Sequence, residues 1–387
     1  MSAMIALPRL MRIGAGASTE LAATLTSLGL SRPLVITDRY LLESGRVERL
    51  LADLKAGGVA EARVFADTVS DPTASSIEAG VAFLAEGEHD CVVGFGGGSP
   101  LDSAKAIAVL SRFGGGMRDY MVPHVQDTPG LPVIAVPTTA GTGSEATRFT
   151  IVTDEATNEK MLCVGLAYLP IAALVDYELT LTMPRRLTAD TGIDSLTHAI
   201  EAYVSKRANP FSDAMALQAM RAIAPNLRVV DREPDNRAAR EAMMLGATQA
   251  GIAFSNASVA LVHGMSRPVG AYFHVPHGLS NAMLLPAVTA WSAPAALGRY
   301  AQCAVAMGVA GENEGDQSAV ARLLEELRAL NADLEVPSPA RYGIDRARWD
   351  AVMDSMAEQA LASGSPGNNP RVPDAEEIKA LYRLAYA

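Results

Sequence analysis

The sequence predicts an α/β fold built on a mainly parallel sheet in the N-terminal part, followed by an all-helical C-terminal part. Short apolar runs alternate with helical patterns as far as Pro184, and beyond it helical spacing continues without strand-like alternation. The length of 387 residues also exceeds the size at which a single hydrophobic core stops growing. We therefore expect two domains, residues 1–184 and residues 185–387.

The strands of the first domain are predicted from continuous apolar runs, because strands covered on both faces need no polar alternation. These runs are residues 33–38, 62–66, 90–95, 131–136 and 170–176. Helical patterns fall at residues 41–54, 75–86 and 101–110. Residues 148–154 and 160–164 predict a β-hairpin attached to the same domain.

The second domain is predicted from segments whose apolar residues recur every three or four positions. These segments are residues 193–205, 210–226, 237–253, 258–265, 278–284, 295–307, 318–330, 346–355 and 375–386.

Composition narrows the possible partners and the location of the chain. A net charge of −11 argues against nucleic acid or an anionic membrane as the main partner. We find no apolar run of about 18 residues that could span a membrane, and no signal peptide at the N-terminus. The three cysteines form no CxxC pair, which suits a reducing compartment. We expect a cytoplasmic protein that acts on a small molecule.

Two Gly-, Ser- and Thr-rich loops follow predicted strands. Residues 96–99 (GGGS) join a strand to a helix, so glycine backbone and helix N–H groups can cradle a phosphate. The motif is neither a P-loop nor GxGxxG, and a tight turn without ligand is the alternative. With the loop at residues 138–145, it fits a nucleotide lying across the sheet edge. Asp38, at another strand end, would hold a ribose 2′-hydroxyl and repel a 2′-phosphate, or else is a solvated acid.

Asp194 and His198 are four residues apart, so a helix places both side chains on one face. Alone, this pair is more typical of an ordinary helix surface than of a metal site. His263 and His277 lie in a second histidine-rich segment that the fold could bring close, at the end of an apolar run and at a helix start. Carboxylate and imidazole together suit a divalent transition metal. With the loops in one domain and these residues in the other, we expect the active site between the domains.

Several long motifs together resemble the iron-containing (group III) alcohol dehydrogenase family. They are GGGSPLDSAK at residues 96–105, PTTAGTGSE at 137–145, GIDSLTHAIEAY at 192–203, and the segments at 263–286 and 368–386. They occur in order along the whole chain. The resemblance implies a nucleotide-binding α/β domain and an all-helical metal-binding domain, an architecture shared with dehydroquinate synthase. It also implies NAD, one divalent metal (Fe²⁺, sometimes Zn²⁺) and a homodimer or larger homo-oligomer.

The resemblance also assigns site residues. It makes Asp194, His198, His263 and His277 the metal ligands. It places along the cofactor Asp38, Asp71 (where the family often has Asn), Gly96, Gly97, Gly98, Ser99, Asp102, Thr138, Thr139, Thr142, Thr147, Phe149, Lys160 and Leu179. For Lys160, an exposed strand lysine is the alternative.

One position departs from the family pattern. Arg267 stands where the family usually has a histidine near the nicotinamide, and arginine does not titrate near neutral pH. The proton would then leave through water or His274, although His274 also fits a plain packing role. Arg267 itself has a catalytic alternative, in which it binds an anionic group of the substrate, and an internal one, in which it pairs with a buried carboxylate or the cofactor phosphates.

The predicted reaction is metal-dependent, NAD-linked hydride transfer between a primary alcohol and its aldehyde in the interdomain cleft. The alternative within this class is a reductase for an anionic aldehyde, such as a semialdehyde or a phosphonate- or phosphate-bearing one, recognised through Arg267. Two other classes compete with it. A dehydroquinate synthase-like lyase would need several basic residues in its substrate pocket, and a non-catalytic NAD sensor would not need a complete set of metal ligands.

Overall fold

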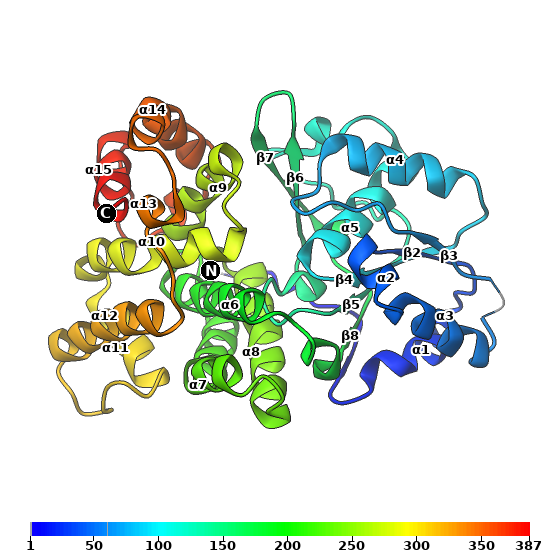
Figure 1. Ribbon diagram of the computed structural model, residues 1–387, viewed down its shortest axis with the longest axis horizontal. Coiled ribbons are helices and arrows are strands. Elements are labelled where there is room, and N and C mark those ends of the chain that lie inside the picture. Colours follow the sequence, from blue (N-terminus) through cyan, green and yellow to red (C-terminus); the bar gives the residue numbers. More distant parts are fainter. Residues whose placement is uncertain (1, 60) are drawn as a thin grey trace. The chain divides into compact units, whose positions relative to one another are not determined.

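Two units make up the chain, which the computed structural model describes over residues 2–59 and 61–387 (Figure 1). The first unit is Ala6–Thr182, and the second is Met183–Ala387 with the residues that precede Ala6. Met1 and Ala60, both in the predicted first domain, lie outside the described residues. The functions that we assign to the two predicted domains remain predictions.

A six-stranded parallel sheet forms the centre of the first unit. Its order is β1 (Leu10–Ile13), β8 (Ala172–Val175), β5 (Val133–Pro137), β4 (Cys91–Gly96), β2 (Pro33–Ile36), β3 (Arg63–Phe65). Each predicted strand is present. Strand β1 was missed because it lies at the sheet edge and is only partly buried, so its sequence lacks the continuous apolar signal of a central strand.

Helices cover both faces of this sheet, as the alternation of side chains along β2 shows. Leu34 and Ile36 point to a core shared with α4 (Ala74–Ala85) and α5 (Gly98–Phe113). Val35 points to the opposite core, shared with α1 (Leu21–Leu28) and α3 (Arg46–Ala56). All three strand residues are fully buried, which explains why the run is apolar throughout.

Two smaller elements of the first unit flank the sheet. The short helix α2 (Arg39–Glu43) follows β2 directly. The predicted hairpin is present as the antiparallel pair β6 (Phe149–Asp154) and β7 (Glu159–Val164). Both lie next to segments that were predicted to contact a nucleotide.

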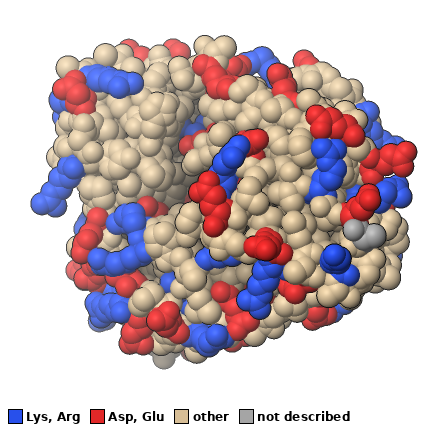
Figure 2. All heavy atoms as spheres, turned by 45° about the vertical axis from the view of Figure 1, so that its right-hand side comes forward, with Lys and Arg blue, Asp and Glu red and all other residues tan. Residues whose placement is uncertain are grey.

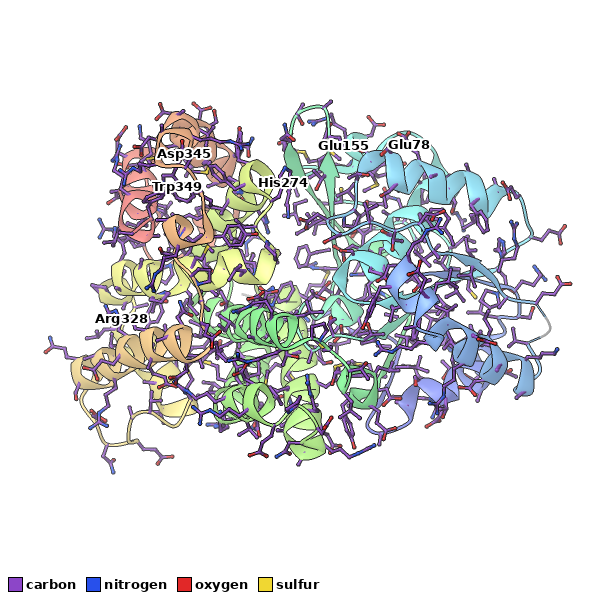
Figure 3. All side chains as sticks on the ribbon, in the orientation of Figure 1. Glu78, Glu155, His274, Arg328, Asp345 and Trp349 are labelled. Carbon is purple, nitrogen blue, oxygen red and sulfur yellow. The ribbon has the colours of Figure 1, made fainter. Side chains whose placement is uncertain are left out.

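The second unit is helical, and no described residue after β8 lies in a strand. Its helices are α6 (Arg185–Val204), α7 (Pro210–Arg232), α8 (Arg237–Asn256), α9 (Leu261–Phe273), α10 (His277–Ser292), α11 (Leu297–Ala306), α12 (Asp316–Asp333), α13 (Pro339–Tyr342), α14 (Arg346–Ala362) and α15 (Ala375–Ala385). Trp349 of α14, labelled in Figure 3, is fully buried. Its ring contacts those of Phe273 and Tyr382, which joins α14 to α9 and α15.

Several helices are longer than predicted. Helix α6 begins at Arg185 rather than near residue 193, and α9 and α10 continue past Pro268 and Pro286. A proline inside a helix costs about 3 kcal/mol. Both α9 and α10 are mostly buried, so packing offsets this cost, and sequence periodicity alone cannot weigh the two effects.

Acidic and basic side chains are interspersed on the face shown in Figure 2, without a large area of one sign. Among the described helices, none by itself has the length and apolar composition to cross a membrane. Helices α8 and α9 meet that test only when taken together, and they are bent by 104°.

Candidate active site

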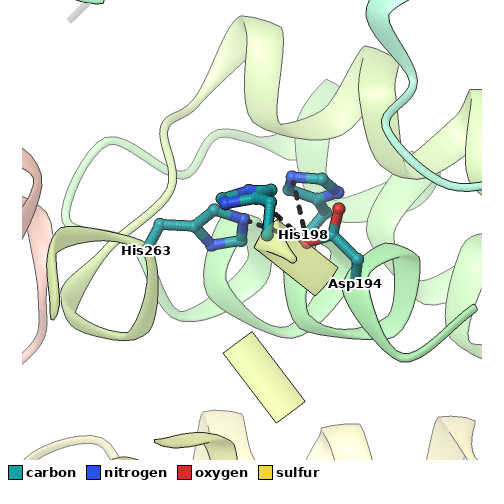
Figure 4. Close-up of side chains that lie close together, drawn as sticks. Asp194, His198 and His263 are labelled. Atoms are coloured by element: carbon teal, nitrogen blue, oxygen red, sulfur yellow. Dashed lines mark ion pairs between the residues drawn. The ribbon is translucent and has the colours of Figure 1, made fainter. Parts of the chain in front are cut away.

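Four side chains from three helices converge in the second unit. Asp194 and His198 lie one turn apart on α6, and His263 lies in the first turn of α9 (Figure 4). His277 is the first residue of α10. One ligand atom from each residue lies within 4.8 Å of every other. The structure thus brings together the four residues that the sequence predicted as metal ligands.

The spacing of these atoms fits a small divalent ion. Asp194 Oδ1 lies 3.4 Å from His263 Nε2 and 3.8 Å from the Nε2 atoms of His198 and His277. Four ligand atoms set tetrahedrally at about 2.0–2.2 Å from one ion would lie about 3.3–3.6 Å apart. Three imidazoles and one carboxylate suit Fe²⁺ or Zn²⁺, so both the chemistry and the spacing of the donors fit a metal.

Metal binding requires neutral imidazole and ionised carboxylate, and the pKa shifts of His198 and Asp194 favour these states. Burial lowers the pKa of His198 to about 3, although Asp194 opposes this, so His198 is neutral at pH 7. Burial by itself would raise the pKa of Asp194, but attraction to the three histidines lowers it below its usual value. Burial lowers the pKa of His263, yet Glu201 and Asp194 raise it overall.

Glu201, which the sequence analysis did not single out, supports this cluster. Its Oε2 lies 2.6 Å from His263 Nδ1 and its Oε1 accepts a 2.6 Å hydrogen bond from Val262 N. Glu201 lies three residues after His198 and seven after Asp194, so it shares their face of α6. That helical spacing was the signal that could have identified it.

Asn281 is a second residue that the sequence analysis missed. It lies one turn after His277 on α10, is fully buried, and donates from Nδ2 to Asp194 Oδ1 at 2.7 Å. The same nitrogen lies 3.1 Å from His263 Nε2 and 3.3 Å from His277 Nε2. Asn281 therefore orients the carboxylate and competes with a metal for the imidazole lone pairs.

Arg267 is buried one turn after His263 on α9 and donates from Nη1 to Ser365 Oγ at 2.9 Å. Burial lowers its pKa to about 10 and the neighbouring Glu201 raises it, so the guanidinium stays charged at neutral pH. These contacts are internal to the second unit. His274 is exposed at the C-terminal end of α9 (Figure 3), and its predicted alternative as a proton route stays untested.

In the first unit, three predicted cofactor segments follow adjacent strands. Asp38 follows β2, Gly96–Ser99 follows β4, and Thr138 follows β5. Chain order reverses between β2 and β4, with β3 beyond one and β5 beyond the other, and nucleotides bind at such switch points. One oxygen of the Asp38 carboxylate, Oδ1, accepts a hydrogen bond from Leu41 N and so caps the N-terminus of α2.

The glycine turn is in contact with the second loop. Helix α5 begins at Gly98 rather than near residue 101, so Gly98 and Ser99 belong to its first turn. A Cβ on Gly98 would lie 2.7 Å from Thr142 Cγ2, and one on Gly97 would lie 3.2 Å from Thr139 Cγ2. The absence of side chains lets the loops meet at a helix N-terminus, where anions bind well.

Asp71, Ser99 and Lys160 form a connected group beside this turn. Lys160 Nζ lies 2.8 Å from Asp71 Oδ1, and Asp71 N donates to Ser99 Oγ at 3.3 Å. The Lys160 side chain is only 5% exposed, so the alternative of an exposed strand lysine is wrong. Asp71 has a φ of 53°, a conformation that asparagine also tolerates.

Other residues that were predicted to contact the cofactor take part in a buried hydrogen-bond network around Lys105. Its Nζ donates to Ser144 Oγ at 2.7 Å, Thr147 Oγ1 at 3.1 Å and Phe149 O at 2.9 Å. Asp102 accepts from Ser144 Oγ and Ile151 N. Lys105 thus fixes the second loop against α5. Leu179 lies apart from this network, in a short 3₁₀ helix after β8.

We expect Lys105 to make the stability of the first unit depend on pH. Burial lowers the pKa of Lys105 to about 8, against 10.5 in the unfolded chain. Between these values the unfolded chain binds more protons, so stability rises with pH, by at most about 3 kcal/mol. Below pH 8 the lysine is charged in both the folded and the unfolded state, so it does not make the free energy of unfolding depend on pH.

Urea unfolding of wild type and Lys105→Met from pH 7.5 to 10.5 should give a difference in the free energy of unfolding that changes across this window. Parallel curves would contradict the prediction.

Comparison with known proteins gives matches along nearly the whole chain. Residues 8–177 match the family model described as iron-containing alcohol dehydrogenase. Residues 188–386 match the C-terminal model of the Fe-containing alcohol dehydrogenase family. Each of the four clustered residues lies within the second match.

Individual proteins are similar over comparable lengths. A long-chain-alcohol dehydrogenase 1 from Geobacillus thermodenitrificans is 38% identical, over 100% of this chain and 97% of the relative. An NAD-dependent methanol dehydrogenase from Bacillus methanolicus is 34% identical, over 96% of this chain and 97% of the relative. A crystal structure of a 1,3-propanediol oxidoreductase has a TM-score of 0.94 and 34% identity, and each chain is covered completely.

Proposed function

The chain belongs to the iron-containing alcohol dehydrogenase family, and from this premise we propose that it interconverts a primary alcohol and its aldehyde with NAD and one divalent metal, Fe²⁺ first and Zn²⁺ second. The observation that carries the proposal is the convergence of Asp194, His198, His263 and His277 at the spacing of a four-ligand site. Named relatives act on a long-chain alcohol and on methanol, which supports this substrate class.

In this proposal the four clustered residues hold the metal. Asp194 supplies the negative charge, and His198, His263 and His277 would supply nitrogen lone pairs. When bound, the cation supplies Lewis-acid polarisation of the alcohol or aldehyde oxygen, and NAD supplies the hydride acceptor. Asn281 keeps the Asp194 carboxylate oriented, and the mostly buried surroundings limit the access of water.

The first unit would bind the dinucleotide along the carboxyl edge of β2, β4 and β5. The N-terminus of α5, bordered by Gly97, Gly98 and Thr142, offers backbone N–H groups to the pyrophosphate. Asp38 places a negative charge at the end of β2, which supports NAD over NADP. The position of the reaction between the two predicted domains remains a prediction.

Arg267 does not support the anionic-aldehyde alternative. Its guanidinium is buried and donates a hydrogen bond to Ser365 within the second unit. The relatives described above are named for uncharged alcohols. We therefore do not retain a substrate anion as its partner, and because Arg267 stays charged we assign it no proton transfer.

We further propose a cytoplasmic homodimer or larger homo-oligomer without nucleic-acid or membrane partners. The net charge of −11 supports the proposed lack of nucleic-acid and membrane partners. The cysteines Cys91, Cys163 and Cys303 are free and buried, which suits a reducing compartment. Light scattering of the purified chain would measure the oligomeric state.

The test combines anaerobic metal analysis with an NADH-consumption assay on uncharged and anionic aldehydes. We expect about one equivalent of iron or zinc per chain, turnover that a chelator removes and added metal restores, and preference for uncharged aldehydes. Retained NAD binding without metal or turnover would overturn the proposal and favour the sensor. Preference for anionic aldehydes would restore the rejected role of Arg267.

A further inference from the structure

Glu201 joins the two helices that carry three of the four predicted ligands. It lies on α6 with Asp194 and His198, yet both of its oxygens bond to α9. Oε1 accepts from Val262 N, and Oε2 lies 2.6 Å from His263 Nδ1. The side chain is 4% exposed, so water does not compete for these bonds.

The bond to His263 determines which ring nitrogen carries the proton. An ionised carboxylate only accepts hydrogen bonds, so Nδ1 must be the protonated nitrogen of a neutral ring. The lone pair of Nε2 then faces Asp194 Oδ1, 3.4 Å away, where the ligand atoms converge. The other tautomer would direct an N–H group into the cluster and block metal binding.

We propose that Glu201 is the positioning residue of the metal site, holding His263 in the tautomer and orientation that present Nε2 to the ion. This inference rests on the proposed function, because it requires that the cluster binds a metal. Carboxylates behind ligand histidines typically strengthen metal binding by 10- to 100-fold. No side chain caps the start of α9 at Ala260, so Glu201 also provides the acceptor that the first turn needs.

The ring of His198 is held differently from that of His263. The Nδ1 atom of His198 is buried and has no hydrogen-bond partner among the described residues. Its ring is instead stacked between Phe254 and His263, with centroids at 4.3 and 4.4 Å. Stacking restricts the plane of the His198 ring but not its tautomer, so the carboxylate bond at Nδ1 distinguishes His263 from His198.

Arg267 is a buried cation whose charge is attracted to the Glu201 carboxylate. It lies one turn after His263 on α9, and its attraction to Glu201 opposes the effect of burial on its pKa. A buried carboxylate without a counter-charge would be costly.

The test is the affinity of Glu201→Gln for Zn²⁺ and Co²⁺, measured against a competing chelator. Glutamine keeps the shape of the glutamate side chain but has only one oxygen that can accept hydrogen bonds. Two N–H groups, those of Val262 and of His263 Nδ1, need an acceptor, so one of them loses its partner. We expect metal affinity to fall by about 10- to 100-fold, with altered visible bands of the Co²⁺ form. The matched control is Asp213→Asn, the same change at a carboxylate of this unit that pairs with Arg299. It should bind metal as wild type does.

The outcomes separate this inference from the proposed function. Wild-type affinity and an unchanged Co²⁺ spectrum in Glu201→Gln would overturn the positioning role alone. Failure of the wild type to bind metal would overturn the metal site and the positioning role together. If Glu201→Gln does not fold, the positioning role is tested on the Zn²⁺-loaded wild type by NMR spectroscopy. Its ¹⁵N-histidine spectrum should show metal-bound imidazoles of which that of His263 has an Nδ1–H shifted downfield by its carboxylate acceptor, and absence of that shifted signal would refute the proposal.

Discussion

Replacing Asp194 by alanine is expected to abolish metal binding and turnover while leaving the fold intact. The carboxylate is fully buried, and its Oδ1 lies within 3.8 Å of the Nε2 atoms of His198, His263 and His277. Without it, only three neutral nitrogens remain and the charge that balances the cation is lost. We expect bound metal below about one tenth of an equivalent and a loss of turnover of at least about 10³-fold. His263→Ala should behave in the same way.

Metal analysis, circular dichroism and the NADH assay, made on one preparation, test this expectation. The control is His124→Ala, which removes an exposed histidine of the first unit. It should retain both metal and activity, which would show that the loss is specific to the cluster. A fully active Asp194→Ala protein would refute the site, and an unfolded one would shift the test to His263→Ala.

The sequence predicted the four residues that cluster in the second unit because two signals agreed. Helical spacing put Asp194 and His198 on one face, and the family motifs supplied His263 and His277. The residues behind them were missed for a physical reason. Glu201 and Asn281 act on side chains 62 and 87 residues away in the chain, and such contacts depend on how α6, α9 and α10 pack. Local periodicity contains no information about that packing.

A similar limit applies to the predicted nucleotide loops. Strand ends and glycine content located Asp38, Gly96–Ser99 and Thr138 at one sheet edge, and the sheet order agrees. The motif could not show that Thr147 and Phe149 bond to Lys105, nor that Asp102 accepts from Ser144 and Ile151. The lysine within GGGSPLDSAK was left unassigned, because an apolar helix pattern does not reveal a buried charge that the neighbouring loop satisfies.

Gly278→Ala is expected to separate α10 from α6 and to weaken metal binding. A Cβ on Gly278 would lie 2.3 Å from Asp190 O and 3.3 Å from Asp194 Cβ. Helix propensity alone predicts a gain of about 1 kcal/mol, since Gly278 is the second residue of α10. The clash should win, because the nearest atoms belong to the backbone of a buried helix and cannot rotate away. We expect a net loss of about 1–3 kcal/mol in stability.

The effect on the metal follows from the position of His277. This histidine directly precedes Gly278, so any shift that relieves the clash moves its Nε2 away from Asp194 Oδ1, now 3.8 Å distant. A displacement of about 1 Å is enough to spoil a ligand site, and metal affinity should fall at least about tenfold. The control is Gly311→Ala in the same unit, where a Cβ would meet nothing within 4 Å. It should leave affinity and urea midpoint nearly unchanged. Equal affinities in the two variants would mean that the close approach of α10 to α6 does not position His277.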